Sequence, residues 1–267
     1  MLTAGLLGVV QGLTEFLPVS SDGHLAAFAL LTGASPMSLA LAVVLHTGTL
    51  VATVVVLRDD LVRLASACAR GLREPTRFAG TRDGAFVLVL ATACVPTAIV
   101  GLSLEGVAAE ANRHILVVGA GFLVSAGAVL LTRDRAPMGD QLSLRAALVL
   151  GAVQGLAVLP GVSRSGSTIA CAMLLGLAPA EAFRLSFVLS VPAVAGAVLL
   201  ELRSPEARAA ITPVAWFGAA VAGVVGYACL RLLRRLLARG HFWRFSWYLI
   251  PLGLGMIAWG LLSATGG

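Results

Sequence analysis

The chain has 267 residues, of which 58% are hydrophobic and 12% are charged, and its formal net charge is +6 at pH 7. A soluble domain carries about 25% charged residues, so this composition excludes a soluble globular protein and indicates a membrane protein. All 19 basic residues are arginine, and in a membrane protein basic residues mark cytoplasmic loops rather than a nucleic-acid-binding surface.

The hydrophobic pattern contains broken and unbroken apolar segments. Two regions, 1–33 and 145–180, are interrupted by Pro, Gly and Ser and carry polar residues at the interruption. A broken segment cannot satisfy its backbone against lipid, so we expect two re-entrant helix pairs surrounded by protein or by a water-filled cavity. Six unbroken segments are long enough to cross a bilayer, at 40–57, 86–103, 114–132, 183–200, 213–230 and 246–263.

The two broken regions resemble each other in sequence. "GVVQGLTEFLPVSSDGHLA" begins at Gly8 and "GAVQGLAVLPGVSRSGSTIA" begins at Gly151. The spans that follow them also align, "LAVVLHTGTLVA" with "LSFVLSVPAVAG". We therefore predict an all-α polytopic membrane protein of two repeats, 1–132 and 145–267, joined by a linker at 133–144 and integrated into one domain.

Each repeat contains one re-entrant pair and three spans, and an odd number of spans makes the second repeat inverted relative to the first. Arginine counts set the orientation. Loop 58–85 contains six arginines, 133–145 contains three and 231–244 contains five, whereas the opposite loops contain three in total. By this bias we expect the arginine-rich loops in the cytoplasm of a bacterial inner membrane and both termini on the periplasmic or external side. The two breaks should then meet near the middle of the bilayer.

The first break carries a carboxylate, an imidazole and several hydroxyls. Gln11 and Glu15 are four residues apart and would share one helix face. Pro18 should end that helix, and 19–23 should form the turn. The polar residues of this turn and the residue after it are Ser20, Ser21, Asp22 and His24.

The second break places Arg164 within a run of serines and glycines, followed by the apolar helical run "TIACAMLLGL". Backbone N–H groups and hydroxyls at a helix N-terminus form an anion site, and a guanidinium is suited to phosphate oxygens. A structural alternative is that Arg164 serves only as the counter-ion of Glu15. The other residues expected to contact substrate here are Ser163, Ser165, Gly166, Ser167 and Thr168, with Ser20 from the first break.

The combined set is typical of phosphoryl transfer, which needs a nucleophile, a proton acceptor and positive charge for the phosphate oxygens. Other polar residues carry less weight. His46 lies inside span 40–57, far in sequence from these breaks, so we expect at most an indirect role. Trp243, Trp247 and Tyr248 fit an interfacial aromatic belt.

At these breaks the sequence resembles the undecaprenyl-pyrophosphate phosphatases, the integral-membrane bacitracin-resistance family. "QGLTEFLPVSSDGHL" resembles the first family motif and "PGVSRSGSTI" the second, and the resemblance covers nearly the whole chain. It implies six spans with two inverted re-entrant pairs. It also implies hydrolysis of undecaprenyl diphosphate to the monophosphate and inorganic phosphate, which recycles the lipid carrier for cell-wall synthesis.

The resemblance also implies roles for individual residues. Glu15 matches the essential glutamate, and Gln11 matches a position that holds Glu or Gln. Ser21 matches a proposed nucleophile. His24 matches a histidine proposed as acid/base or as nucleophile, and Arg164 matches the phosphate-binding arginine. The choice between Ser21 and His24 as nucleophile stays open.

The implied cofactor is a divalent cation, Mg²⁺ or Ca²⁺, for which we expect Glu15, Gln11 and Asp22 as ligands. Asp22 departs from the family pattern, which commonly has threonine there. A carboxylate next to a diphosphate would repel it unless the carboxylate is protonated or bound to the metal, which puts the metal ligands in question.

A rival hypothesis is a polyprenyl-phosphate flippase, with or without phosphatase activity, because broken helices that meet in mid-membrane also occur in transporters. The expected partners are a polyprenyl diphosphate lipid and the bilayer, with no nucleic acid. A homodimer is left open.

Overall fold

The fold is taken from a computed structural model, which describes residues 1–32, 39–201, 203, 205, 208 and 211–265. The described residues are almost entirely helical, and their one β-type pairing is the isolated bridge between Gly139 and Leu177. Residues 33–38 of the predicted first repeat lie outside the described residues, as do residues 202, 204, 206–207, 209–210 and 266–267 of the predicted second repeat.

Helices run along both halves of the chain. The first half contains α1 (Leu2–Phe16), α2 (Ser21–Thr32), α3 (Leu39–Val56), α4 (Arg58–Arg73), α5 (Pro75–Phe78), α6 (Arg82–Ala111) and α7 (Ile115–Leu130). The second half contains α8 (Leu144–Leu156), α9 (Arg164–Leu174), α10 (Pro179–Glu201), α12 (Pro213–Ala238), the 3₁₀ turn η1 (Phe242–Phe245) and α13 (Ser246–Thr265). A helix therefore occupies each of the six segments predicted to be spans.

Length and hydropathy support a multi-pass membrane protein. Four helical segments of the described chain are long and apolar enough to cross a bilayer: α6, α10, α12 and the run Phe242–Ser263. The pair α3 and α4 passes the same test together but is bent by 77°, so it brings the number to five if it counts as one span. The predicted loop 58–85 is largely helical, because α4 and α5 lie within it.

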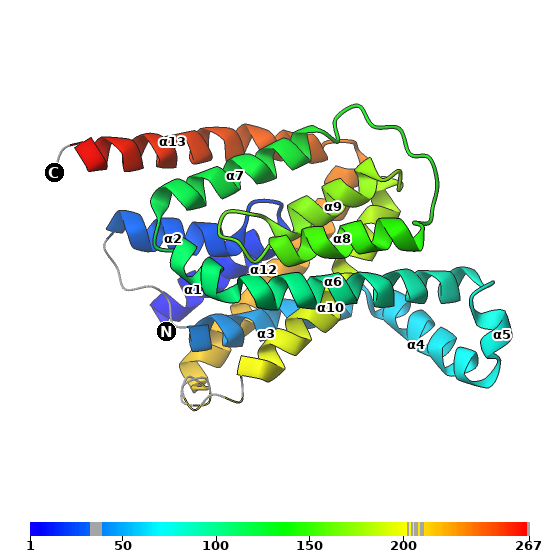
Figure 1. Cartoon of the computed structure of the whole chain (residues 1–267). Coiled ribbons are helices and arrows are strands. Elements are labelled where there is room, and N and C mark those ends of the chain that lie inside the picture. The colour runs from blue at the N-terminus through cyan, green and yellow to red at the C-terminus, as the bar shows by residue number, and fades with distance from the viewer. Residues whose placement is uncertain (33–38, 202, 204, 206–207, 209–210, 266–267) are drawn as a thin grey trace.

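The two ends of the bundle differ in what they carry. The start of α1 and the end of α13 lie at one end, and α4, α5 and the linker after α7 lie at the other (Figure 1). Ion pairs tie the second end together: Arg184 binds Asp60 of α4 at 2.8 Å, and Arg82 lies 3.7 Å from Asp140 of the linker. The arginine-rich segments 58–85 and 133–145 therefore share one end of the molecule.

Glycines let the first helix of each broken region approach a long helix of the other half. On α1, a Cβ at Gly12 would lie 2.7 Å from the Ala222 carbonyl oxygen of α12. On α8, a Cβ at Gly151 would meet the carbonyl oxygen of Ala93 on α6 and lie 2.6 Å from the Pro96 ring. Backbones in such close contact pack well without bulky side chains, as in small-residue interfaces within membranes.

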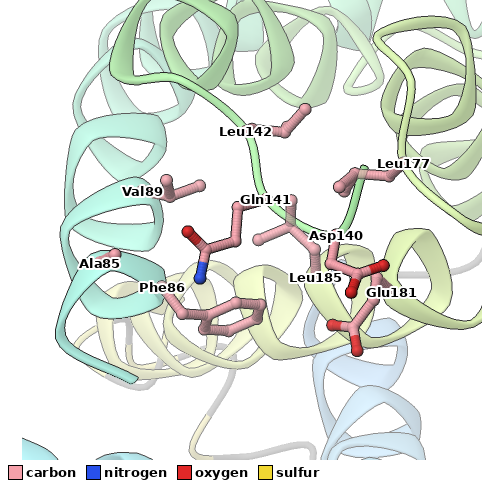
Figure 2. Close-up of a pocket in the computed structure, with 9 residues that line it drawn as sticks. All are labelled: Ala85, Phe86, Val89, Asp140, Gln141, Leu142, Leu177, Glu181 and Leu185. Carbon is pink, nitrogen blue, oxygen red and sulfur yellow. The ribbon is translucent and has the colours of Figure 1, made fainter. Parts of the chain in front are cut away.

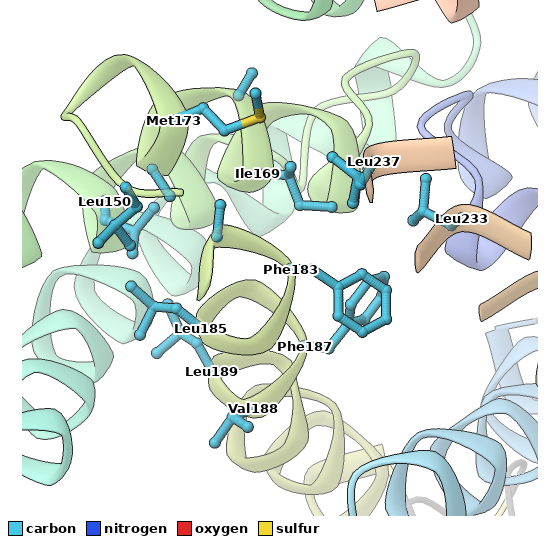
Figure 3. Packing of buried hydrophobic residues seen from close by; sticks show 14 of the residues in the cluster. Leu150, Ile169, Met173, Phe183, Leu185, Phe187, Val188, Leu189, Leu233 and Leu237 are labelled. Carbon is cyan, nitrogen blue, oxygen red and sulfur yellow. The ribbon is translucent and has the colours of Figure 1, made fainter. Parts of the chain in front are cut away.

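The largest hydrophobic cluster holds α9 in place (Figure 3). Ile169 of α9 is fully buried and belongs to the same cluster as Phe183 and Phe187 of α10 and Leu233 of α12. Because Arg164 is the first residue of α9, the packing of this helix fixes the position of the Arg164 backbone, from which the guanidinium extends.

We predict that Gly151→Ala lowers the free energy of unfolding by about 1–3 kcal/mol, because the added methyl group overpacks the α6–α8 contact. Gly127→Ala on α7 is the matched control, since its Cβ would have nothing within 4 Å. That variant should be neutral or gain about 0.5–1 kcal/mol from helix propensity. Melting temperatures in detergent test both, and equal melting temperatures for the two variants would contradict the proposed close packing.

Candidate active site at the two helix breaks

The Glu15 carboxylate is the centre of a buried polar cluster. Its Oε1 pairs with Nη2 of Arg164, which comes from the other half of the chain. Its Oε2 accepts hydrogen bonds from the Ser21 hydroxyl at 2.9 Å and from the Gln11 amide at 3.1 Å. Nε2 of His46 lies 3.4 Å from the same oxygen. The two predicted breaks and α3 thus meet at one carboxylate.

Arg164 still has hydrogen-bonding capacity beyond this ion pair. It is the first residue of α9, after the N-cap Ser163, and its side chain is 21% exposed. Its Nη1 is buried and has no hydrogen-bond partner in the described structure. The counter-ion alternative therefore accounts for one of the two terminal nitrogens, and the other remains able to bind an anionic oxygen.

The turn of the first break is shorter than predicted. Residues 21–23 do not belong to it, because α2 already begins at Ser21. Ser20 has a positive φ of 67°, and its hydroxyl accepts a hydrogen bond from the Gly23 N–H at 3.2 Å, so it caps the helix. Ser21 and Asp22 are therefore in the first turn of α2, where free backbone N–H groups favour anions.

The backbones of the two breaks are in direct contact. The Ser20 hydroxyl donates to the Val162 carbonyl at 3.4 Å, and the Ser165 hydroxyl donates to the Leu17 carbonyl at 3.3 Å. A Cβ at Gly23 would lie 2.7 Å from Cα of Gly161. The two breaks therefore meet in the structure, as the sequence predicts.

Most hydroxyls predicted to contact substrate have protein partners. The Ser163 hydroxyl accepts the Gly166 N–H at 3.1 Å. The Thr168 hydroxyl contacts the Arg164 carbonyl at 2.7 Å and also the hydroxyl of Ser186. Ser167 is buried within α9. These residues build the N-terminal turn of α9, so their contribution to an anion site comes from the backbone and the helix dipole.

His24 contacts Tyr248 of α13. Its Nδ1 lies 2.8 Å from the Ser20 carbonyl oxygen, and its Nε2 lies 2.6 Å from the Tyr248 hydroxyl. The rings of His24 and Tyr248 are nearly parallel, and the Phe122 ring packs edge-on at 5.2 Å. A carbonyl oxygen only accepts, so Nδ1 carries the hydrogen and Nε2 accepts from the tyrosine.

The residues expected to bind a metal differ in whether their side-chain oxygens are available to it. Both oxygens of Glu15 already accept hydrogen bonds or ion pairs from protein donors. Oε1 of Gln11 is buried without a hydrogen-bond partner, and Asp22 is exposed, so both can offer an oxygen. Three acidic, His or Cys residues grouped to hold a metal are absent from the described residues. The two available oxygens, from Gln11 and Asp22, suit Mg²⁺, which takes one or two protein oxygens plus substrate phosphates and water.

Three residues that contact this site were not predicted to do so: the sequence suggested at most an indirect role for His46, placed Tyr248 in an aromatic belt and did not point to Ser125. His46 contacts Gln11 at 3.2 Å, and Tyr248 holds His24. The third is Ser125 of α7, which accepts the Ser163 N–H at 2.7 Å and donates to the Gly161 carbonyl at 2.9 Å. A sequence signal existed for His46, a polar residue aligned with Ser190 of the second repeat.

A small cavity lies elsewhere, between α6, α10 and the linker (Figure 2). Its volume is about 20 Å³, and Phe86, Gln141 and Glu181 are among the residues that line it. A space of that size holds about one water molecule and no diphosphate. The helix breaks are the candidate site because the anion-binding groups lie there.

Comparison with known proteins gives a match along the whole chain. The family model described as "Bacitracin resistance protein BacA" matches residues 4–255. An undecaprenyl-diphosphatase of Desulfosudis oleivorans is 42% identical, with 95% of this chain and 96% of the relative covered. Proteins of the same name from Geobacter metallireducens and Korarchaeum cryptofilum are 37% and 34% identical. Their matches cover 96% and 95% of this chain and 97% of each relative.

We predict that inorganic phosphate stabilises the protein through the free nitrogen of Arg164. At a concentration of 100 times Kd the gain in unfolding free energy would be about 2.7 kcal/mol, seen as a higher melting temperature in detergent. Arg164→Gln should abolish the shift, and Arg113→Gln, an exposed arginine before α7, should keep it. A shift of the same size in Arg164→Gln would contradict this site.

Proposed function

We propose that this chain, which belongs to the bacitracin resistance protein BacA family, hydrolyses undecaprenyl diphosphate to undecaprenyl phosphate and inorganic phosphate. The observation that carries the proposal is the contact of Ser21, Glu15 and Arg164 at the junction of the two breaks. A hydroxyl, a carboxylate that accepts its hydrogen bond and a guanidinium with a free nitrogen are the parts that phosphoryl transfer needs.

In the reaction we propose, the diphosphate binds between the N-termini of α2 and α9. Nη1 of Arg164 and the first N–H groups of the two helices hold the phosphate oxygens. The polyprenyl chain stays in the lipid next to the bundle. This arrangement places negative charge where two helix dipoles and a guanidinium favour it.

The geometry favours Ser21 over His24 as the nucleophile. The Ser21 hydroxyl already donates to Glu15, so the carboxylate can take its proton as the oxygen attacks the terminal phosphorus. The bond from that phosphorus to the bridging oxygen breaks, and undecaprenyl phosphate leaves. Water then hydrolyses the phosphoserine to release inorganic phosphate. His24, at the rim with Tyr248, is placed to exchange a proton with that water or with the leaving group.

The divalent cation we propose, Mg²⁺ or Ca²⁺, would be held by the Asp22 carboxylate, the Gln11 amide oxygen and the substrate phosphates. When bound, it supplies positive charge for the phosphate oxygens. The charge of Asp22 lies near those of Glu15 and Arg164. A cation between Asp22 and the diphosphate would remove the repulsion that this carboxylate otherwise brings. The third expected ligand, Glu15, we assign instead to Ser21 and Arg164.

For the topology we propose six spans, α3, α6, α7, α10, α12 and α13, in two inverted repeats, with α1–α2 and α8–α9 as re-entrant pairs. The support is the matched glycine packing of α1 on α12 and of α8 on α6. The arginine-rich end would face the cytoplasm of a bacterial inner membrane, and both termini would lie outside. The re-entrant pair with Glu15 would then enter from the outer side.

The rival function, flipping of polyprenyl phosphate without hydrolysis, is not favoured by the relatives, which are named undecaprenyl-diphosphatases. Incubation of the purified protein with farnesyl diphosphate and Mg²⁺ separates the two functions. A phosphatase releases inorganic phosphate, and a flippase alone releases none.

We predict that Arg164→Lys lowers kcat for phosphate release by about 100- to 1000-fold. The guanidinium has one terminal nitrogen for Glu15 and another for a phosphate oxygen, whereas an ammonium has a single nitrogen. Arg113→Lys should keep wild-type activity. Phosphate release from farnesyl diphosphate measures both, and full activity of Arg164→Lys would remove the central role of this guanidinium.

We also predict a covalent phosphoserine. Acid quenching during turnover should leave an acid-stable phosphate on the peptide that contains Ser21, detectable by mass spectrometry. Ser21→Ala should lose the label and lower kcat by at least about 1000-fold. An acid-labile label on His24 would instead identify the histidine as the nucleophile.

A further prediction concerns the cation. Asp22→Asn should raise the Mg²⁺ concentration for half-maximal activity about tenfold, as expected from the loss of about 1.4 kcal/mol of binding free energy. Glu110→Gln, an exposed carboxylate at the end of α6, is the control. A Mg²⁺ titration that is unchanged in Asp22→Asn would exclude Asp22 as a ligand.

A further inference from the structure

We propose that His46 is a positioning residue, which fixes the Glu15 carboxylate through the side-chain amide of Gln11. The inference rests on the proposed function, because its effect is on the carboxylate that receives the Ser21 proton. It assigns a purpose to a residue of α3 that lies outside both helix breaks.

The hydrogen positions follow from what each partner can do. Nδ1 of His46 lies 2.8 Å from the Ala42 carbonyl oxygen, one turn earlier in α3. A carbonyl oxygen only accepts, so Nδ1 carries the hydrogen. Nε2 lies nearer the Gln11 amide nitrogen, at 3.2 Å, than the Glu15 carboxylate oxygen, at 3.4 Å, so we take the imidazole as neutral, with Nε2 as an acceptor. Nε2 faces Nε2 of Gln11 at 3.2 Å, so the amide must donate there.

The same amide nitrogen has a second hydrogen, which points to Glu15. The distance from Nε2 of Gln11 to Oε2 of Glu15 is 3.1 Å. If the amide were rotated by 180°, its oxygen would face the carboxylate oxygen and the imidazole lone pair, and both contacts would be repulsive. His46 and Glu15 together therefore permit only one orientation of the amide.

The burial of Gln11 and Glu15 makes the orientation of the amide energetically important. Gln11 is fully buried, and Glu15 is 7% exposed, so water cannot replace a missing partner without cost. With the amide fixed, Oε2 of Glu15 accepts hydrogen bonds from Gln11 and Ser21, while Oε1 forms the ion pair with Arg164. The carboxylate is thereby held in the one orientation that serves both the nucleophile and the phosphate-binding arginine.

Two conservative substitutions distinguish the roles of the two imidazole nitrogens. His46→Gln reaches the position of Nε2 and can accept from Gln11. His46→Asn reaches only the position of Nδ1 and leaves the Gln11 N–H buried without an acceptor. We expect His46→Gln to keep kcat for farnesyl diphosphate within about threefold of wild type, and His46→Asn to lower kcat by about 5- to 100-fold. KM should stay within about twofold in both, because His46 does not contact the substrate.

A double-variant cycle tests whether the effect passes through Gln11. In a Gln11→Leu background, assayed at a Mg²⁺ concentration that saturates this variant because Gln11 is also a proposed cation ligand, His46→Asn should lower kcat by less than about twofold, because the amide it acts on is gone. Thr53→Val is the matched control on α3, since among the described residues the Thr53 hydroxyl bonds to the Thr49 carbonyl of its own helix. It should keep wild-type kcat. Melting temperatures of all variants check that each is folded, and His46→Leu replaces His46→Asn should the latter not fold.

The outcomes distinguish this inference from the proposed function. Wild-type protein that releases no phosphate would refute both. With an active wild type, the positioning role is overturned by equal losses in His46→Gln and His46→Asn, or by full activity in both. An undiminished His46→Asn effect in the Gln11→Leu background would also overturn it, because His46 would then act by another route.

Discussion

The ion pair between Glu15 and Arg164 is the interaction on which the arrangement of the site depends. Each partner lies at a helix break, and the two breaks are 149 residues apart in the chain. An ionised side chain inside a membrane protein is costly unless it is paired, so neither residue is stable there without the other. The pair joins the two halves at the point where the anion-binding groups meet. It also leaves one guanidinium nitrogen free, so the same contact serves both the fold and the chemistry we propose.

A break at that position is possible only because its backbone groups find partners. In a bilayer no water is available to satisfy free carbonyls and N–H groups. The serines of the two breaks and of α7 supply those partners: Ser20 bonds to Val162, Ser165 bonds to Leu17, and Ser125 bonds to both Gly161 and Ser163. The serine-rich composition of the breaks is thus mainly a solution to backbone burial. Ser21, whose hydroxyl points to the carboxylate instead, is the exception that the chemistry uses.

The surroundings of Glu15 explain why its role differs from that of Asp22. Arg164, Ser21 and Gln11 surround the Glu15 carboxylate with donors, which stabilises the charged form and leaves little room for a cation. Asp22 stands exposed at the start of α2, without such a set of partners. Two carboxylates seven residues apart therefore suit different tasks, one as a base and one as a candidate ligand for a cation.

The sequence by itself determined the class of protein and the positions of the helices at the six predicted spans. Hydropathy is a property of each segment, so the helices at the predicted spans could be read from composition, and the resemblance of the two motifs to the BacA family is confirmed. The sequence also indicated that Glu15 and Arg164 should meet, because unpaired charges at membrane depth are unfavourable. Tertiary structure alone decided which groups surround them. His46 and Tyr248 reach the site from α3 and α13 through the packing of distant helices, and no local pattern specifies such contacts. The start of α2 at Ser21 likewise depends on the Ser20 cap and on the contact of that break with Val162, which forms only when both halves are folded.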